Sequence, residues 1–491
     1  AVIGFLLSCT AVMGADNYLW IKKENGEEIK FSIDGTTTSD GDWKTDNPYE
    51  DAGNIWDTGT KTYTNNTTLS SSKANDKDGN KEISYGLRLS GDLTGVNFVN
   101  NGSITGEMSG NGYGIYNYKS EMENITNAGV ISGTGKSDSK GINTGSGIYN
   151  KSGTMKNITN VGVISGTGKN DDKGYGYGIY NSGTMKNITN TGLISGTGSS
   201  GSGTGYGIYN SLGTIGDITN AGVISGTGKS DSDAGTGSGI NNDSDDKEMG
   251  DITNTGIISG TGSSTDGDGI GYGINNSSSA AMGDITNTGL ISGSGSGFGS
   301  GKVGAGCGIY NDSNGKEMGA ITNTGIINGY GTNSDSGDGT GCGIYNISGT
   351  MGAITNTGVI NGYGYSTNTG VGGGIFTDSN AAKIGNITNI GIISGTGIGA
   401  SATLGFGINN GAGTIGNITN TGIISGTGSG IYNQSGTIGA ITNTGVIYGK
   451  TNAINKNSGT IDPSSNYGIL VNGDGGKGVV DGLGIVDKLT I

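Results

Sequence analysis

The chain of 491 residues has no histidine, only two prolines and three cysteines, and Arg88 is its single arginine. Without histidine, a histidine-dependent catalytic triad and a zinc site with histidine ligands are excluded. The 41 acidic residues outnumber the 26 basic ones and give a net charge of −15, whereas a nucleic-acid binder needs a basic surface. The shortage of proline, without glycine at every third position, also excludes collagen.

Hydrophobic residues are scarce as well, at 31% of the chain, while glycine supplies 107 residues. This glycine content is roughly three times the ordinary usage. A conventional globular core of this length needs more apolar side chains. The composition therefore indicates either a disordered chain or a repeat structure with a thin core.

The first fifteen residues resemble the apolar part of a secretory signal peptide. Residues 1–14 read AVIGFLLSCTAVMG, and polar sequence follows from Asp16. No later apolar run approaches the ~20 residues of a membrane-spanning helix. We therefore expect an exported protein whose residues 1–15 are the remnant of a signal peptide.

A repeat dominates the rest of the chain. The tripeptide Ile-Thr-Asn recurs from Ile125 to Ile441, with Gly-Ile about ten residues before most copies and another Ile six residues after each. Internal periods of 20 to 50 residues are typical of solenoids. We interpret residues 85–460 as about twelve such units, 16–84 as an N-terminal capping segment, and 461–491 as degenerate units of a truncated C-terminal end.

The shortest unit shows how each repeat folds. Residues 431–449 read IYNQSGTIGAITNTGVIYG and contain three short apolar segments, each bounded by glycine, serine or asparagine. None is long enough for a helix, and the β-branched residues favour strands. The sequence therefore predicts an all-β fold, a parallel β-helix (β-solenoid) of three-strand rungs. Its expected right-handedness follows from the general bias of parallel crossovers.

Longer units carry extra residues between the third segment and the next Gly-Ile. These stretches are rich in glycine, serine, aspartate, asparagine and threonine, as in residues 196–201. Because insertions at one point of every unit map to one edge of a solenoid, we expect a fringe of polar loops there. Such loops are a candidate contact surface.

The asparagine of each Ile-Thr-Asn lies two residues after an isoleucine. Side chains alternate across a strand, so an inward isoleucine places this asparagine inside as well. We expect the amides to stack along the axis and to bond to one another. The predicted structural ladder consists of Asn127, Asn160, Asn190, Asn220, Asn254, Asn287, Asn323, Asn356, Asn389, Asn420 and Asn443.

An aromatic residue follows the Gly-Ile anchor in many units. These positions predict an exposed aromatic ladder, whose rings either stabilise neighbouring rungs by stacking or bind sugar rings or a partner. Its candidate members are Tyr116, Tyr149, Tyr180, Tyr209, Tyr310 and Tyr345.

Cys307 and Cys342 occupy the same position in adjacent units, each directly before Gly-Ile. Stacked rungs would place their Cα atoms about 5 Å apart, within the range of a disulfide. Export would permit oxidation. The alternative is that two small side chains fill a position that tyrosine, serine or glycine occupies in other units.

No catalytic, cofactor-binding or metal-binding set emerges from the sequence. After residue 130 the only glutamates are Glu248 and Glu317, there is no arginine, and the aspartates lie mainly in the glycine-rich stretches. Glycan-active β-helices need clustered carboxylates at a groove. We therefore expect no enzymatic activity, no cofactor and no metal, with a glycan-active enzyme as the third interpretation.

The apolar leader, the capping segment and the Gly-Ile-Tyr-Asn/Ile-Thr-Asn-Thr-Gly-x-Ile units together resemble the passenger domain of a bacterial autotransporter, the type V secretion family. The resemblance covers most of the chain. It implies translocation through a C-terminal outer-membrane β-barrel, display on the cell surface, and adhesion to a host-cell or matrix glycan or protein in virulence. The 491 residues contain no such barrel, so a barrel is expected to follow them. The second interpretation is a secreted β-solenoid of a matrix or filament, without a barrel.

Overall fold

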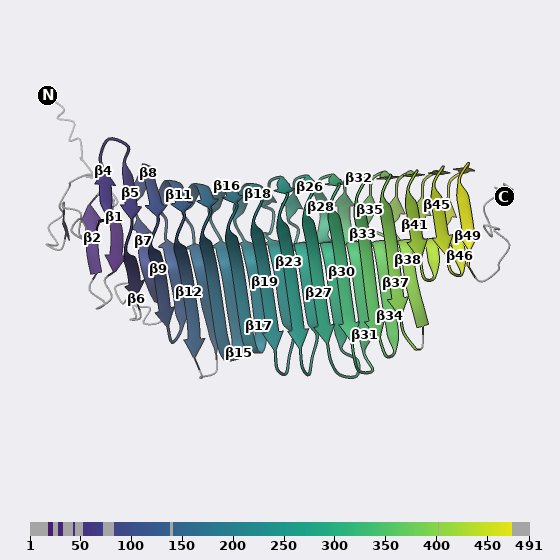
Figure 1. Ribbon diagram of the computed structural model, residues 1–491, viewed down its shortest axis with the longest axis horizontal. Helices are drawn as coiled ribbons and strands as arrows, with labels where there is room; N and C mark the ends of the chain where they lie inside the picture. The colour runs from purple at the N-terminus through teal and green to yellow at the C-terminus, as the bar shows by residue number, and fades with distance from the viewer. Residues whose placement is uncertain are drawn as a thin grey trace, which may run out of the picture.

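The computed structural model describes residues 18–22, 28–32, 43–44, 53–71, 83–137, 141–400 and 402–473. Within these ranges every regular element is a β-strand, and the strands form one elongated stack (Figure 1). Nearly all strand pairs are parallel and join one turn of the chain to the next. The described part of the chain contains no helix capable of crossing a membrane. The fold is therefore the all-β parallel β-solenoid that the repeat predicts, while its handedness stays a prediction.

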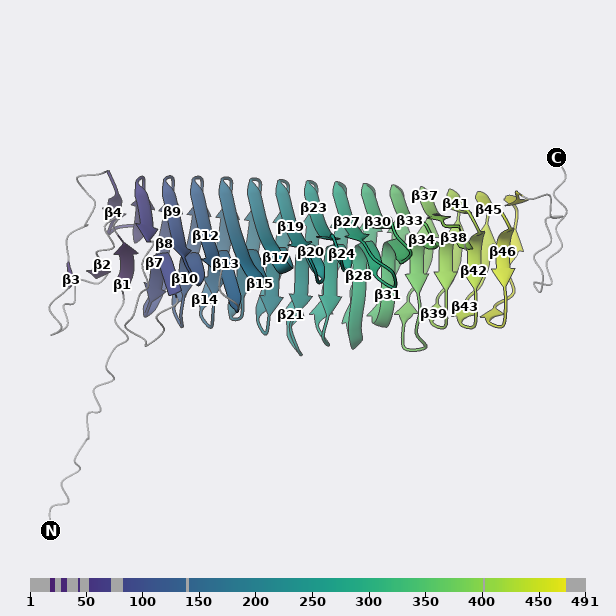
Figure 2. The same ribbon diagram turned by 90° about the horizontal axis from the view of Figure 1, so that it is seen from below.

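Each turn has three faces, which the chain visits in order. Face 1 carries the Gly-Ile segments, face 2 the Ile-Thr-Asn segments and face 3 the last apolar segment of the unit. Figure 2 shows face 1 strands such as β13, β20 and β24 following one another along the rod. Face 1 contains β7 (Ile83–Ser90), β10 (Asn111–Asn117), β13 (Ile142–Asn150), the second halves of β15 (Val163–Asn181) and β17 (Leu193–Ser211), β20 (Gly235–Asp243), β24 (Gly269–Ser277), β28 (Val303–Met318), β31 (Asp338–Met351), β34 (Thr369–Thr377), β38 (Ala402–Asn410), β42 (Ser429–Asn433) and β46 (Asn452–Lys456).

Face 2 is the shortest of the three. Its main strands are β5 (Thr62–Asn65), β8 (Asp92–Asn100), β11 (Glu121–Asn127), β14 (Thr154–Asn160), β16 (Thr184–Asn190), β18 (Thr214–Asn220), β22 (Ile252–Asn254), β26 (Ile285–Asn287), β29 (Ile321–Asn323), β32 (Ile354–Asn356), β36 (Ile387–Asn389), β40 (Ile418–Asn420), β44 (Ile441–Asn443) and β48 (Ser465–Asn466). Two-residue strands precede some of them: β21 (Glu248–Met249), β25 (Ala281–Met282), β35 (Lys383–Ile384), β39 (Thr414–Ile415), β43 (Thr437–Ile438) and β47 (Thr460–Ile461).

Face 3 completes each turn and leads into the next. It contains β6 (Thr68–Ser71), β9 (Ser103–Met108), β12 (Val130–Ser137), the first halves of β15 and β17, β19 (Val223–Ser230), β23 (Ile257–Ser264), β27 (Leu290–Gly297), β30 (Ile326–Asn333), β33 (Val359–Ser366), β37 (Ile392–Ile398), β41 (Ile423–Gly426), β45 (Val446–Gly449) and β49 (Ile469–Asn472).

The stack extends beyond the repeat at both ends, so its number of turns differs slightly from the expected twelve. At the start, β5 and β6 pair in register with β8 and β9, and they lie inside the segment 16–84 that the sequence assigned to a cap. At the far end, β48 and β49 pair in register with β44 and β45. The expected signal-peptide remnant 1–15 lies outside the described residues. So does the greater part of the expected C-terminal segment 461–491, from residue 474 onward.

Four further strands lie at the N-terminal end. β1 (Tyr18–Lys22) runs antiparallel to β7 and covers its free edge, and β2 (Glu28–Ser32) pairs antiparallel with β1. β3 (Trp43–Lys44) adds to β2, while β4 (Ile55–Asp57) forms a hairpin with β5. An open strand edge can pair with other chains, so a strand that covers it acts as a cap.

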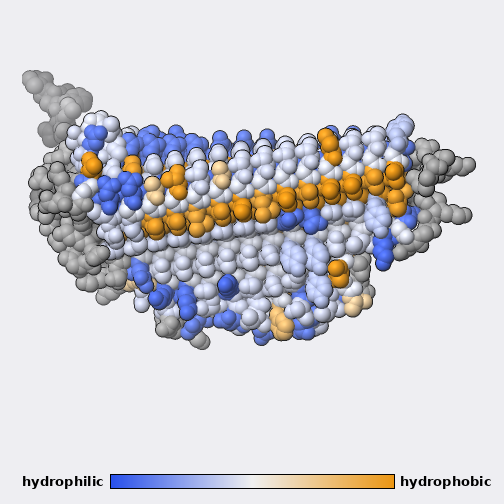
Figure 3. Space-filling view, viewed as in Figure 1, coloured by the Kyte–Doolittle hydropathy of each residue, from blue (hydrophilic) through white to orange (hydrophobic). Residues whose placement is uncertain are grey.

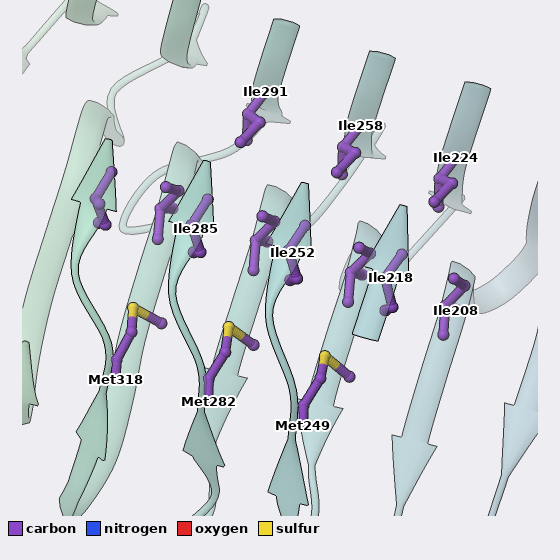
Figure 4. Packing of buried hydrophobic residues seen from close by; sticks show 14 of the residues in the cluster. Ile208, Ile218, Ile224, Met249, Ile252, Ile258, Met282, Ile285, Ile291 and Met318 are labelled. Carbon is purple, nitrogen blue, oxygen red and sulfur yellow. The ribbon is translucent and has the colours of Figure 1, made fainter. Parts of the chain in front are cut away.

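The core consists of four columns of apolar side chains, one side chain per column in each turn. Figure 4 shows Ile208 of face 1, Ile218 of face 2 and Ile224 of face 3 pointing inward. Met249, labelled in the next turn, belongs to the fourth column. All four side chains are almost fully buried. Burying an isoleucine or methionine stabilises a fold by about 1.5–3 kcal/mol, so a thin core repeated in each turn can hold the rod together.

A second lobe, which we call the blade, projects from the corner between faces 3 and 1 (Figure 1). It comprises the extended parts of these strands, from 132–137 and 141–147 in its first full turn to 394–400 and 402–407 in its last. The expected fringe of loops is wrong here, because the inserted residues continue the strands, as in the single strand β15. Loops are confined to the tips, such as 265–268.

The blade has no apolar core, and its two sheets meet through glycine. A methyl group built on Gly166 would lie 1.9 Å from the backbone oxygen of Tyr177, and one on Gly196 would lie 2.0 Å from that of Tyr206. No side chain fits at such a distance, so these positions require glycine. The sheets therefore approach more closely than the ~10 Å of ordinary stacked sheets, which explains much of the chain's glycine content.

Candidate functional site

The predicted asparagine ladder is continuous along face 2. In each turn the Nδ2 atom donates to the Oδ1 atom of the next asparagine, for example from Asn160 to Asn190 at 2.8 Å and from Asn190 to Asn220 at 2.8 Å. The same Nδ2 of Asn190 also lies 3.2 Å from the carbonyl oxygen of Gly192 and 3.1 Å from that of Val223. All eleven predicted members are buried in register. Asn65, Asn100 and Asn466 extend the ladder at its ends.

Face 1 carries a second asparagine ladder, which the sequence interpretation missed. The Nδ2 atom of Asn150 donates to Asn181 at 2.8 Å, and that of Asn210 donates to Asn242 at 2.9 Å. The signal was present, because the asparagine of Gly-Ile-Tyr-Asn also lies two residues after an inward isoleucine. Its members are Asn117, Asn150, Asn181, Asn210, Asn242, Asn276, Asn311, Asn346, Asn410 and Asn433, with Thr377 in place of one asparagine.

Cys307 and Cys342 are register partners in β28 and β31. Both are buried, and both are free thiols, so the disulfide that their spacing allowed is not formed. Side chains of in-register parallel strands point the same way, whereas a disulfide needs Cβ atoms within about 3.5–4.5 Å of each other. Hydrogen bonding to Cys307 and burial raise the pKa of the Cys342 thiol, which favours its protonated form.

The six predicted tyrosines lie in one column along face 1, which Asn241 and Asn275 interrupt between Tyr209 and Tyr310. Their rings are half-buried, and Tyr116 is buried. Ring centroids are 5.6 Å apart for Tyr116 and Tyr149, and 4.6 Å apart for Tyr149 and Tyr180. The Tyr180 and Tyr209 rings are 5.1 Å apart, and those of Tyr310 and Tyr345 are 5.6 Å apart. The expected exposure is therefore wrong, because these side chains lie at the bend between the blade and the body of the rod.

A second aromatic column at this bend covers the first. Its members lie three residues before the residues of the first column. They are Tyr113, Tyr177 and Tyr206, which precede predicted tyrosines, and Tyr272, which precedes Asn275. The Tyr177 ring lies 5.0 Å from that of Tyr180 and 5.2 Å from that of Tyr209. Burial, and then the neighbouring tyrosines, raise the pKa of Tyr177 well above its usual range. Alternation alone could not reveal this column, because the strand bends at the intervening glycine.

An aliphatic stripe runs along face 3 on the outer surface (Figure 3). It is made by the first residue of each face 3 strand from β12 onward, and the next residue along the chain is the inward isoleucine or leucine. Several members are well exposed, including Ile326 at 42% and Ile469 at 47%. The stripe consists of Val130, Val163, Leu193, Val223, Ile257, Leu290, Ile326, Val359, Ile392, Ile423, Val446 and Ile469. Large continuous apolar patches mark interaction surfaces.

Two grooves accompany the bend on face 1. One has a volume of about 500 Å³ and is lined mainly by tyrosines, including Tyr177 and Tyr206. The other, which we call the end groove, lies where the blade stops and has a volume of about 410 Å³. In the described part of the chain, no three histidine, cysteine, aspartate or glutamate side chains group together as metal ligands would.

Comparison of the chain with protein-family models, curated proteins and solved structures finds no match. The observed architecture, a parallel β-solenoid of stacked turns, is of the kind that suits a passenger or stalk domain.

Proposed function

We propose that this chain is the surface-displayed passenger of an autotransporter-like protein, a structural rod that also adheres to other surfaces. The observation that carries the proposal is the unbroken succession of parallel strand pairs from β5 to β49. Each turn pairs only with the turns before and after it, so the rod spans distance at about 4.8 Å per turn.

The surface supports an adhesive role. The aliphatic stripe repeats one kind of side chain in each turn from β12 to β49, and the bend carries a succession of aromatic rings, so each offers a partner many similar contacts. Weak contacts that act together give strong overall binding. We further propose that the chain is not an enzyme, and that its partner is a glycan or protein of a host cell or matrix.

The test is to locate the protein on the cells that make it. An epitope inserted at the blade tip 265–268, where the chain is a loop, should label intact cells and should be removed by external protease. Loss of adhesion in a strain lacking residues 83–473, with surface display of a control protein unchanged, would support the adhesive role. If the epitope appeared only in the culture medium, the secreted matrix or filament protein would be the better interpretation.

A further inference from the structure

The end groove exists because the blade stops abruptly. In the turn of β37 and β38 the blade is still present, whereas only Thr427 and Gly428 connect β41 to β42 in the next turn. β38 accordingly pairs with β42 only from Phe406 onward. The last turn of the blade therefore ends in a step, with Leu404 and Phe406 lining the groove above Gly428 and Ser429.

Three aromatic rings follow one another inside this groove. The Phe376 and Phe406 rings are 6.0 Å apart and steeply inclined, while the Phe406 and Tyr432 rings are 5.1 Å apart and nearly parallel. Gly373 allows this arrangement, because a methyl group there would lie 2.1 Å from Cδ2 of Phe376. Phe376 and Tyr432 are two turns apart, about 10 Å along the axis, which is the reach of two successive sugar rings.

A buried polar atom without a partner points to a ligand in the same groove. Asn409 lies between Phe376 and Tyr432 in the column that contains Tyr310 and Tyr345, is only 6% exposed, and lines the groove. Its Oδ1 atom makes no hydrogen bond. Leaving a buried acceptor unpaired is unfavourable, and a hydroxyl group entering the groove would satisfy it.

We propose that the end groove binds a neutral oligosaccharide. No ionisable group other than the Tyr432 phenol lines it, and its remaining polar side chains are amides and hydroxyls: Asn409, Gln434, Asn455, Ser429 and Thr451. Aromatic faces pack against the apolar faces of sugar rings, and amides bond to their hydroxyls. This inference rests on the proposed adhesive function and assigns it a site and a ligand class.

The test measures binding of the purified chain to immobilised neutral oligosaccharides, including cellohexaose and chitohexaose. A hyaluronan hexamer serves as the acidic probe, and an extended uncharged decapeptide tests strand addition to the open edge of β38. We expect at least one neutral oligosaccharide to bind and both other probes to fail. Absence of binding to every neutral oligosaccharide, or a preference for the acidic probe or the peptide, would overturn the proposal.

Two variants assign the binding to the groove. Asn409→Leu removes the unpaired oxygen and keeps the side chain's size, so affinity should fall about tenfold without loss of thermal stability. Tyr432→Ala should also weaken binding, whereas Tyr310→Ala, in the same column but outside the groove, should not. Equal affinity of all three variants would refute the assignment. The binding assay uses purified protein, whereas the test of surface display uses cells. The oligosaccharide proposal can therefore fail while surface display is confirmed, and it can hold while surface display fails.

Discussion

The body of the rod and the blade are built from the same strands but are held together differently. In the body, four isoleucine or methionine columns and two asparagine ladders fill the space between the faces. In the blade the two sheets touch through glycine, and a methyl group at Gly226 would lie 1.9 Å from the oxygen of Ser238. The body therefore depends on what its side chains contribute, and the blade depends on the absence of side chains.

This difference explains how 31% hydrophobic residues suffice for such a long fold. The body uses them efficiently, because each turn buries its inward-facing isoleucine and methionine side chains almost fully. The blade uses almost none and relies on backbone hydrogen bonds between turns and on dispersion between closely packed sheets. Changes in the body should consequently affect the stability of the whole rod, whereas changes in the blade should act locally.

The largest effect is expected from breaking an asparagine ladder in the body. Asn190→Leu leaves the Oδ1 atom of Asn220 without its donor. It also removes the acceptor that the Nδ2 atom of Asn160 has in Asn190, and the donor that Asn190 offers to the carbonyl oxygens of Gly192 and Val223. Each buried group left unpaired costs about 1–3 kcal/mol, so we expect the free energy of unfolding to fall by about 3 kcal/mol. Chemical denaturation followed by circular dichroism measures it.

Asn187→Leu is the matched control, since Asn187 lies in the same strand β16 but faces solvent. Its Nδ2 atom bonds only to Asn157 across the outer surface, at 2.9 Å. A surface change of this kind is usually worth less than about 0.5 kcal/mol. Equal destabilisation by the two variants would show that burial of the ladder contributes nothing.

A smaller and more local effect is expected in the blade. Gly205→Val would place a Cβ atom 2.0 Å from the backbone oxygen of Thr227 on the facing sheet. Overpacking typically costs about 1–3 kcal/mol, and here the sheets can separate without opening the body. Hydrogen exchange should therefore accelerate at blade amides near 196–205 and remain slow at those of Ile208 and Ile218.

Thr204→Val, one residue earlier on the other side of the strand, is the control and should leave exchange unchanged. Faster exchange in the body of Gly205→Val would show that the two lobes unfold together.

Much of the body could be predicted from the sequence, because its signals are side chains with a period of two. Ile218 and Asn220 are inward for the same reason, and the identical Ile-Thr-Asn in each unit fixes the register. The aliphatic stripe was predictable too: in Val223-Ile224, two adjacent strand residues cannot both point inward. The second asparagine ladder follows the same rule.

The blade and the bend were harder to predict. Glycine-rich polar sequence is typical of loops, and only the placement of glycine at every second position, as in Gly226 and Gly228, indicates paired sheets. The exposure of the tyrosines depends on the bend at glycines such as Gly178, where the strand pairing skips one residue between Tyr177 and Ile179 without a change of register. The end groove depends on neighbouring turns of unequal length, so no single unit contains its signal.

The smallest effect is expected at the bend, where the two lobes meet, and only at high pH. The pKa of Tyr177 is raised in the folded state by burial, while an unfolded tyrosine ionises near pH 10. Above that pH the unfolded chain binds fewer protons than the folded one. This contribution to stability is therefore constant below about pH 10 and falls above it, by about 1.4 kcal/mol per pH unit for each such tyrosine.

Urea midpoints from pH 8 to 11.5 should therefore decline less steeply in Tyr177→Phe, whereas the exposed-site control Tyr467→Phe should follow the parent protein. Identical declines in all three proteins would mean that the bend opens before its tyrosines ionise.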